Sequence, residues 1–351
     1  MSAADDEREL LRDTVERLLA EHCVPERVAA AAKTGWDAAA WRALERTGLT
    51  LVGSPEELGG SGGDLASAAD IAVAAGAAAA PVPLTETLAA GMLLAHVGLP
   101  IPPGPLTLAV TAHRQQTLCR VPYGRLATTV AVGVDEGGEW LAVAAHPVQV
   151  RLGRNMAGEP RDDVSLGAGT EVRGAGAGTA DYAQRLRRLF RSLLIAGAAQ
   201  RALELSLAYV TEREQFGRSL AKLPTIQQEL ARMAGEVALI SAAMQAAVAD
   251  DPPAEGTIPA VLAAKAQASQ SAGIVAAIAH QLHGAIGTTE EHHLRLTTTR
   301  LWSWRDEDSP AGDCLAELGR AAIRAGSGGL WPWLSGSRAA GGGQGSPPPR
   351  R

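Results

Sequence analysis

The chain has 351 residues, which is long enough for two or three domains that each bury a core. Its formal net charge is −6, and lysine and arginine are scattered along it, so no basic face for DNA or RNA is expected. Aromatic residues make up only 3%, whereas alanine is abundant. This composition leaves little ring surface for stacking nucleobases and favours closely packed helices.

No apolar run approaches the roughly twenty residues of a membrane span, and the N-terminus is acidic where a signal peptide is basic and then apolar. We therefore expect a cytoplasmic protein with no membrane partner. Cys23, Cys119 and Cys314 are odd in number and far apart, which fits neither a disulfide framework nor zinc-ligand spacing. We interpret them as packing residues and expect no metal.

The first hundred residues have the pattern of helices. Residues 7–23 place leucine and valine on one helical face, and Pro25 is expected to mark the exit from this helix. Further helices are predicted at 38–47, 65–79 and 86–97. The proline-rich segment GLPIPPGP then closes the region. Residues 1–103 are therefore predicted to form an N-terminal α-helical domain.

Beyond residue 104 the pattern changes to short runs rich in Val, Thr and Ala, such as LTLAVTA, TTVAVGV and EWLAVAA. Such runs are typical of strands. The segment DEGGE between two of them predicts a hairpin connection. Three more short segments, AHPVQVRLG, DVSLGAG and TEVRGAG, complete a small β-domain predicted at residues 104–179.

Helical patterns resume at about residue 180. The predicted helices are 180–209, 222–248, 258–284, 289–304 and 312–325. The second has the most regular apolar stripe, with steps of three and four, so it must be buried against other helices. Antiparallel helices of this kind form a bundle, predicted at residues 180–325. Residues 326–351 are rich in Gly, Ser and Pro and are predicted to be disordered, with Trp331 and Trp333 as a candidate docking point.

One loop between these helices carries residues suited to a ligand. Arg213 and Arg218 supply two cations, Gln215 an amide and Phe216 a ring, while Gly217 permits a sharp turn. This combination suits a phosphate or a planar ligand.

The order of helical domain, β-domain and bundle, with motifs spaced along it, resembles the acyl-CoA dehydrogenase family over residues 5–325. PEELGGSGG at 55–63 resembles the loop before the family's fourth helix. REQFG at 213–217 resembles its R-x-x-F-G element, and QLHGAIGTTEEH at 281–292 its Q-x-x-G-x-x-G element. RLWSWRDE at 300–307 resembles shorter members that often form mixed oligomers. The fold class implied by the resemblance is α+β, mostly α.

In that family the R-x-x-F-G loop of one subunit and the Q-x-x-G-x-x-G turn of a neighbour close around FAD. The resemblance therefore assigns Arg213 and Phe216 to flavin phosphate or adenine contacts. It also implies that Gln281, Gly284 and Gly287 line the same cofactor from across the dimer. A guanidinium binds pyrophosphate oxygens in a fork, and glycines let the backbone come close. The alternative is that Arg213 caps a helix end and that the two glycines only terminate a helix.

Two positions depart from the family pattern. Pro224 stands eleven residues after Arg213, where a glutamine commonly touches the flavin. Between residues 104 and 180 we find no strand motif that combines Trp with Ser or Thr, of the kind that covers the flavin ring in the family. One polar contact and one covering element of the family are therefore missing.

Desaturation of an acyl thioester requires a carboxylate that removes the α proton while the β hydride leaves for the flavin. In many family members this base lies about twenty residues after the Gly-rich turn, which in this chain is Asp308, with Glu307 as the alternative if the register slips by one. Against this role, residues 305–308 also fit a solvated charge cluster at a helix end. In the other subgroup the base lies on the helix before R-x-x-F-G. There this chain has arginines, at Arg185, Arg187, Arg188 and Arg191.

Other site types fit the sequence less well. Glu290 and His293 have the E-x-x-H spacing of a di-iron bundle, but no second E-x-x-H appears. His283, at an apolar helix end, is expected to be a packed or capping histidine. The glycines of GGSGGD lack a preceding strand, which argues against a dinucleotide-binding Rossmann site.

The sequence therefore predicts an FAD-dependent acyl-CoA dehydrogenase-like oxidoreductase of fatty acid or lipid metabolism. It would desaturate an acyl-CoA or acyl-carrier thioester within a homo-oligomer or a hetero-oligomer, because the cofactor site is split between chains. An electron-transfer flavoprotein is one candidate acceptor. Two alternatives stay open: a non-catalytic partner subunit that completes a companion's FAD or acyl site, and an acyl-CoA-binding scaffold without redox activity.

Overall fold

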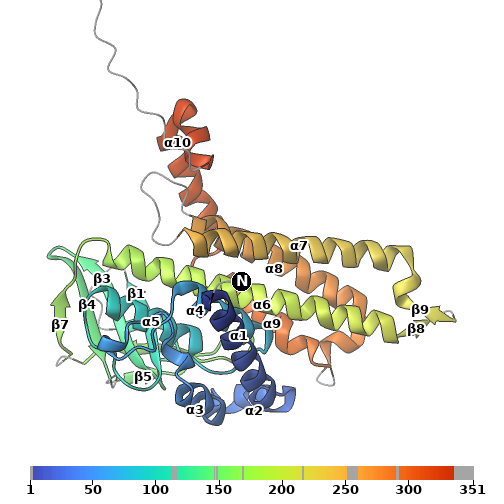
Figure 1. Cartoon of the computed structure of the whole chain (residues 1–351), viewed down its shortest axis with the longest axis horizontal. Helices are drawn as coiled ribbons and strands as arrows, with labels where there is room; N and C mark the ends of the chain where they lie inside the picture. The colour runs from blue at the N-terminus through green and yellow to red at the C-terminus, as the bar shows by residue number, and fades with distance from the viewer. Residues whose placement is uncertain are drawn as a thin grey trace, which may run out of the picture.

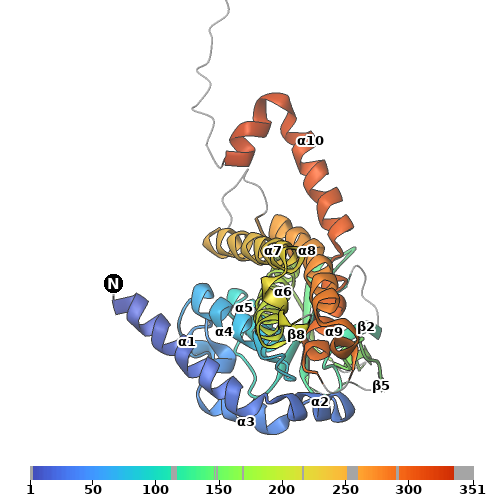
Figure 2. The ribbon, with the colours of Figure 1, turned by 90° about the vertical axis from the view of Figure 1, so that its right-hand side faces the viewer.

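A computed structural model describes residues 3–111, 117–145, 147, 149–167, 170–215, 217–250, 260–289 and 292–335. A β-domain lies at one end of a long helical bundle, and the N-terminal helices cover one flank of both (Figure 1). The mixed architecture, mostly helical with a small β region, is the predicted fold class. Figure 2, along the bundle, shows the longest helix enclosed by the others.

The N-terminal region is helical, as its sequence pattern predicts. Its helices are α1 (Ala3–His22), α2 (Pro25–Thr34), α3 (Ala38–Arg46), α4 (Leu65–Ala77) and α5 (Leu84–His96), with 3-10 turns η1 (Leu49–Leu51) and η2 (Glu56–Leu58). The prediction missed α2. Pro25 begins this helix instead of only ending the previous one, because the first helical turn has no intrahelical partner for its N–H groups. Gly35, at φ 100°, then ends α2.

The β-domain contains two small sheets. Its strands are β1 (Leu106–Thr111), β2 (Thr117–Pro122), β3 (Thr128–Asp135), β4 (Gly138–Ala144), β5 (Gln149–Arg151), β6 (Arg161–Ser165) and β7 (Val172–Gly174). They form sheets of order β1-β3-β4-β7 and β2-β6-β5, in which only the β1–β3 pair among these described strands is parallel. The predicted DEGGE hairpin joins β3 to β4. Strand β2 was not predicted, because its exposed Arg120 and Cys119 interrupt the apolar pattern.

The C-terminal region is a helical bundle. Its elements are α6 (Thr179–Glu212), β8 (Glu214–Gln215), β9 (Arg218–Ser219), η3 (Leu220–Lys222), α7 (Pro224–Ala249), α8 (Ala260–His283), η4 (Gly284–Thr288), α9 (Leu294–Arg305) and α10 (Ala311–Ser335). The stripe predicted on α7 is buried at Met233, Ile240 and Met244, whereas Leu239 on its other face is 53% exposed. The central helix is α6, which packs against α4, α7, α8 and α9.

Helix α10 continues past the boundary predicted at residue 326. Gly326, at φ 66° and ψ 174°, leaves the helical conformation for one residue, and a second helical stretch follows as far as Ser335. In Figures 1 and 2 this distal part stands clear of the bundle. Residues 336–351 of the predicted disordered tail lie outside the described residues.

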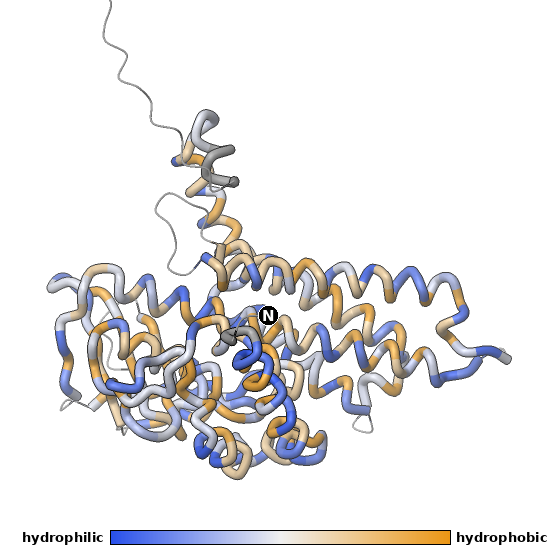
Figure 3. The backbone as a smooth tube through the Cα atoms, in the orientation of Figure 1, coloured by the Kyte–Doolittle hydropathy of each residue, from blue (hydrophilic) through white to orange (hydrophobic). Residues whose placement is uncertain are grey.

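By length and composition, α6 could cross a membrane, but half of its most apolar stretch is buried inside the protein. It therefore has the character of a core helix. Figure 3 shows hydrophilic residues along α1 and at the β8–β9 tip, and apolar residues along the inner sides of the bundle helices.

Two glycines let α4 and α6 cross closely. A Cβ atom on Gly76 would lie 2.2 Å from the carbonyl oxygen of Leu194, and one on Gly197 would lie 1.9 Å from that of Val73. Both distances are far inside van der Waals contact, and both neighbours are backbone atoms. The sequence must therefore keep glycine at both positions for these helices to touch.

We expect Gly197→Ala to lower the free energy of unfolding by about 1–3 kcal/mol or more, because the added methyl group forces the two helices apart. Urea denaturation measures this. The matched control is Gly235→Ala on α7, where no atom lies within 4 Å of the added methyl. There alanine should stabilise the helix by up to about 1 kcal/mol. Equal stability changes of the same sign in both variants would contradict the crossing argument.

Candidate functional site

The R-x-x-F-G segment forms a β-hairpin that projects from the end of α6. Strand β8 pairs with β9, and Gly217 makes the turn at φ 73°. The hydroxyl of Ser219 fixes the base of the hairpin by donating to the carbonyl of Val210 at 2.9 Å. The side chains of Arg213 and Arg218 are exposed. Phe216, predicted as a cofactor contact, lies outside the described residues.

The Q-x-x-G-x-x-G turn lies at the same end of the bundle. The ring of His283, the last residue of α8, stacks on Tyr209 of α6 with centroids 4.4 Å apart. Gly284 adopts φ 64° where α8 ends, which is the helix-terminating role considered for it. Gly287 is buried, and a side chain has no space there, since a Cβ atom would lie 2.9 Å from the Cβ of His283. Gln281 and Gly284 are exposed, so this turn presents one amide and open backbone to solvent.

These two loops fit a phosphate-bearing cofactor that approaches from outside the chain. No atom lies within 4 Å of a Cβ built on Gly217 or Gly284, so a ligand has access to the backbone at both points. They are separated from the β-domain by the 34 residues of α6, a length of about 50 Å. One FAD cannot span that distance. A single FAD therefore cannot contact both these loops and the β-domain of the same chain.

Asp308 and Glu307, the predicted base and its alternative, lie in the loop between α9 and α10. The two carboxylate oxygens of Asp308 bind Arg187 at 2.5 Å and Arg191 at 2.9 Å, and this side chain is 4% exposed. Glu307 receives hydrogen bonds from Nε and Nη2 of Arg161 at 2.9 and 2.8 Å. The idea of a solvated cluster is therefore wrong for both residues. It fits Arg305 and Asp306, which pair with each other and are 41% and 64% exposed.

These pairs belong to a larger set of buried charges, which we call the ion network. Its carboxylates are Glu86 on α5, Glu159 before β6, Glu307 and Asp308, and its guanidinium groups are those of Arg161, Arg187, Arg191 and Arg300. The indole N–H of Trp304 also donates to Glu159 at 2.9 Å. The network joins the N-terminal helices, the β-domain and the bundle with balanced charge.

The electrostatics of the network oppose base catalysis by Asp308. Burial alone would raise its pKa, but the guanidinium groups of Arg187 and Arg191 outweigh burial and hold the pKa well below its usual range. Likewise, burial would raise the pKa of Glu159, but Arg300 and Arg161 lower it to about 2. An effective general base has a pKa near the working pH, and Asp308 is far from that value.

Two cavities border the ion network, and one of them, of about 230 Å³, is lined by β1, β2 and Arg187. The other, lined by Glu86, Tyr123, Arg191 and Trp304, has a volume of about 10 Å³. That is space for one water molecule at most. The interior of the network around Arg191 is therefore filled by side chains.

The backbone of this loop is held in an unusual conformation. Asp308 and Ser309 have φ angles of 53° and 78°, in the left-handed region that costs a non-glycine residue about 1–3 kcal/mol. Lys265 of α8 stabilises the preceding helix end by donating to the carbonyls of Trp304 and Arg305 at 3.4 and 3.0 Å. Burial lowers the pKa of Lys265 to about 8.

Sequence reasoning missed five members of this site, namely Glu86, Glu159, Arg161, Lys265 and Arg300. No local pattern marks Glu159 or Arg161, which flank Pro160 just before β6. The one available signal was the set of arginines at 185–191 without a nearby acid, because buried arginines require carboxylate partners. Among the described residues, no three His, Cys, Asp or Glu side chains come together as metal ligands. Glu290 of the E-x-x-H pattern lies outside the described residues.

Comparison with known proteins now identifies the class. Residues 5–99 match the family model described as the acyl-CoA dehydrogenase N-terminal domain, and residues 174–304 match the acyl-CoA dehydrogenase C-terminal domain. The chain belongs to the acyl-CoA dehydrogenase family, whose members are FAD-dependent flavoprotein oxidoreductases of lipid metabolism.

Two relatives align with most of the chain. Acyl-CoA dehydrogenase IpdE2 of Mycolicibacterium smegmatis is 33% identical over 300 residues, which are 83% of this chain and 91% of the relative. IpdE2 of Mycobacterium tuberculosis is 32% identical over 307 residues, covering 83% and 89%.

Solved structures share the fold at lower identity. The Tcur3481-Tcur3483 steroid ACAD variant superimposes with a TM-score of 0.83 at 22% identity, over 92% of this chain and 99% of that chain. The ChsE4-ChsE5 complex from Mycobacterium tuberculosis has a TM-score of 0.82 at 22% identity, over 92% and 98%.

Arg191 contacts three carboxylates of the ion network, so we expect Arg191→Ala to lower the free energy of unfolding by about 3–5 kcal/mol, because it strands buried negative charges. Chemical denaturation checks this value. The control is Arg201→Ala on the same helix, which removes only an exposed pair with Glu204 and should cost about 0–1 kcal/mol. Similar losses in the two variants would show that the network contributes no more than a surface pair.

The network also makes stability depend on pH. The folded pKa values of Asp308 and Glu159 are lowered, so their contribution is present above the unfolded values near pH 4 and is lost as the pH falls through the folded values. For Glu159, with a folded pKa of about 2, the loss is on the order of 2–3 kcal/mol between about pH 4.5 and 2.

Urea denaturation at steps from pH 6 to 2.5 tests this dependence. Glu159→Gln should give a lower free energy of unfolding at pH 6 and a smaller decrease toward pH 2.5 than the parent protein. The exposed Asp306→Asn serves as the control and should keep the parent's pH profile. If Glu159→Gln showed the same dependence of unfolding free energy on pH as the parent protein, the role of this carboxylate would be contradicted.

Proposed function

We propose that this chain is the non-catalytic partner subunit of a heteromeric acyl-CoA dehydrogenase. The observation that carries the proposal is the pairing of Asp308 with both Arg187 and Arg191, beside a cavity of only about 10 Å³. A carboxylate held in this way is a poor acceptor for an α proton, and the cavity beside Glu86 and Arg191 is too small for an acyl chain. Desaturation of the thioester would therefore occur on a companion chain.

The contribution of this chain would be its bundle end. Arg213 would bind phosphate oxygens of FAD, while Gln281 and the open backbone at Gly284 would contact the cofactor from the same direction. When bound, FAD supplies the hydride acceptor for the desaturation. The exposure of these residues and their distance of about 50 Å from the β-domain of the same chain support a site shared with a companion.

The wider setting follows from the same proposal. The companion would be a second acyl-CoA dehydrogenase-like chain, and the substrate an acyl-CoA or acyl-carrier thioester bound by it. The ChsE4-ChsE5 complex, of similar fold, is an assembly of two named components. We propose a cytoplasmic location and an electron-transfer flavoprotein as acceptor.

The visible absorbance spectrum of this chain, alone and coexpressed with an acyl-CoA dehydrogenase-like companion, tests the proposal. The complex should carry flavin that bleaches with acyl-CoA thioesters under anaerobic conditions, whereas the chain alone should be colourless. Asp308→Asn should leave the bleaching rate of the complex within about twofold. Arg213→Gln should lower its flavin content, because a charge-assisted phosphate contact is lost.

Arg232→Gln, an exposed arginine on α7, is the control for Arg213→Gln and should keep full flavin content. Two outcomes would contradict the proposal. Flavin in the isolated chain that bleaches, and stops bleaching in Asp308→Asn, would establish a self-sufficient dehydrogenase. A complex without flavin would instead favour the scaffold role.

A further inference from the structure

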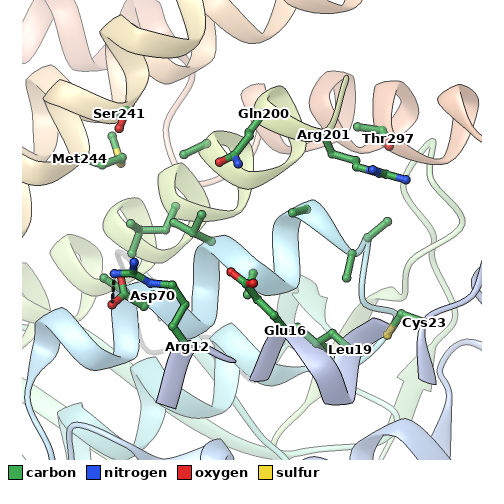
Figure 4. A pocket seen from close by; sticks show the side chains of 18 of the residues that line it. Arg12, Glu16, Leu19, Cys23, Asp70, Gln200, Arg201, Ser241, Met244 and Thr297 are labelled. Atoms are coloured by element: carbon green, nitrogen blue, oxygen red, sulfur yellow. Dashed lines mark hydrogen bonds and ion pairs between the residues drawn. The ribbon is translucent and has the colours of Figure 1, made fainter. Parts of the chain in front are cut away.

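A large open cavity lies on the side of α6 opposite to the ion network. Helices α1, α4, α6, α7 and α9 bound it, and its volume is about 1410 Å³ (Figure 4). On α6, Leu194 and Arg191 face the small cavity of the ion network, whereas Leu193, Ala196 and Gln200 face this one. The two spaces are therefore separate. We call the larger one the α1–α7 cavity.

The walls of the α1–α7 cavity are built from small apolar side chains. The close crossing of α4 and α6 at Gly76 and Gly197 makes these helices a continuous floor. The alanines that line the cavity are Ala20, Ala66, Ala69, Ala74, Ala77, Ala78, Ala79, Ala196 and Ala249. Because an alanine side chain ends at Cβ, the helices enclose space that they do not fill. Larger apolar residues such as Leu19 and Met244 complete the lining.

The three arginines that line the cavity are already paired with carboxylates. Arg8 and Arg12 both bind Asp70, at 2.5 and 3.1 Å, and Arg201 binds Glu204 at 3.1 Å. In Figure 4, Arg12 with Asp70 and Arg201 lie on opposite sides of the opening. Three arginines and four carboxylates line the cavity, which gives a formal charge of −1. An anionic ligand, such as the phosphates of a CoA thioester, therefore finds no free cation and a net repulsive charge.

We propose that the α1–α7 cavity is a binding site for a neutral, elongated apolar molecule. The volume exceeds that of most small-molecule pockets, and most of the lining residues are apolar, with polar side chains such as Glu16 and Gln200 among them, which is an arrangement found in such sites. A neutral apolar ligand would displace water from the alanine walls without disturbing the ion pairs of the arginines. This site is independent of the cofactor loops and of the proposed partner role.

Titration of the full-length protein with Nile red, a neutral elongated fluorophore, tests the site. We expect saturable binding of one molecule per chain. Ala196→Trp, which puts a large ring into the floor, should weaken binding by about tenfold or more. The matched control is Ala208→Trp, an exposed position on the same helix outside the cavity lining, which should bind like the parent.

A second filling variant covers the case in which Ala196→Trp fails to fold. Ala77→Trp, on α4, should weaken binding in the same way. Octanoyl-CoA, added as an anionic competitor, should not displace the dye. Absence of saturable binding in the parent, or equal binding in the folded cavity-filling variants, would overturn the proposal. Displacement by octanoyl-CoA at concentrations comparable to the dye would overturn its neutral ligand class.

Discussion

The contact between Arg191 and the loop after α9 is the interaction on which the rest of the site depends. Its guanidinium group lies in the interior, 5% exposed, and bonds carboxylates from α5 and from the loop. A buried guanidinium without partners would carry a large desolvation cost, so it requires these acids to be present and deprotonated. The acids in turn fix the positions of α5, the segment before β6 and the α9–α10 loop.

Through these ion pairs, three regions of different structure are connected to one another. The β-domain supplies Glu159 and Arg161, the N-terminal helices supply Glu86, and the bundle supplies Arg300 and the loop acids. Apolar packing around α6 and single hydrogen bonds, such as those of Thr87 with Leu106 and of Glu139 with Gly178, also join the regions. Apolar packing tolerates sliding more readily than a hydrogen-bonded charge pair does. The network therefore sets the relative orientation of the regions.

Much of the architecture is accessible from local sequence pattern, because helix stripes and the β3–β4 turn depend on neighbouring residues. The central role of α6 was less visible, since a helix buried on several sides lacks a clean stripe. The sequence located Asp308 and the arginines of α6 separately, but they are 117 positions apart and meet only through the path of the chain. The sequence pattern of a single helix or strand cannot predict such a contact between distant residues. For the same reason the sequence could single out Asp308 as a residue of interest, but it could not predict that Arg187 and Arg191 bind it.

The balanced charge of the ion network has an evolutionary consequence. If Asp308 were freed to act as a base, Arg187 and Arg191 would lose an acceptor, and if either arginine were removed, a buried acid would lose its donor. A return to an open acyl pocket therefore needs coordinated changes in two segments far apart in the sequence. Single substitutions pass through forms with a stranded buried charge. Once such a network has formed, each single substitution that breaks it is destabilising, so the network is difficult to lose during evolution.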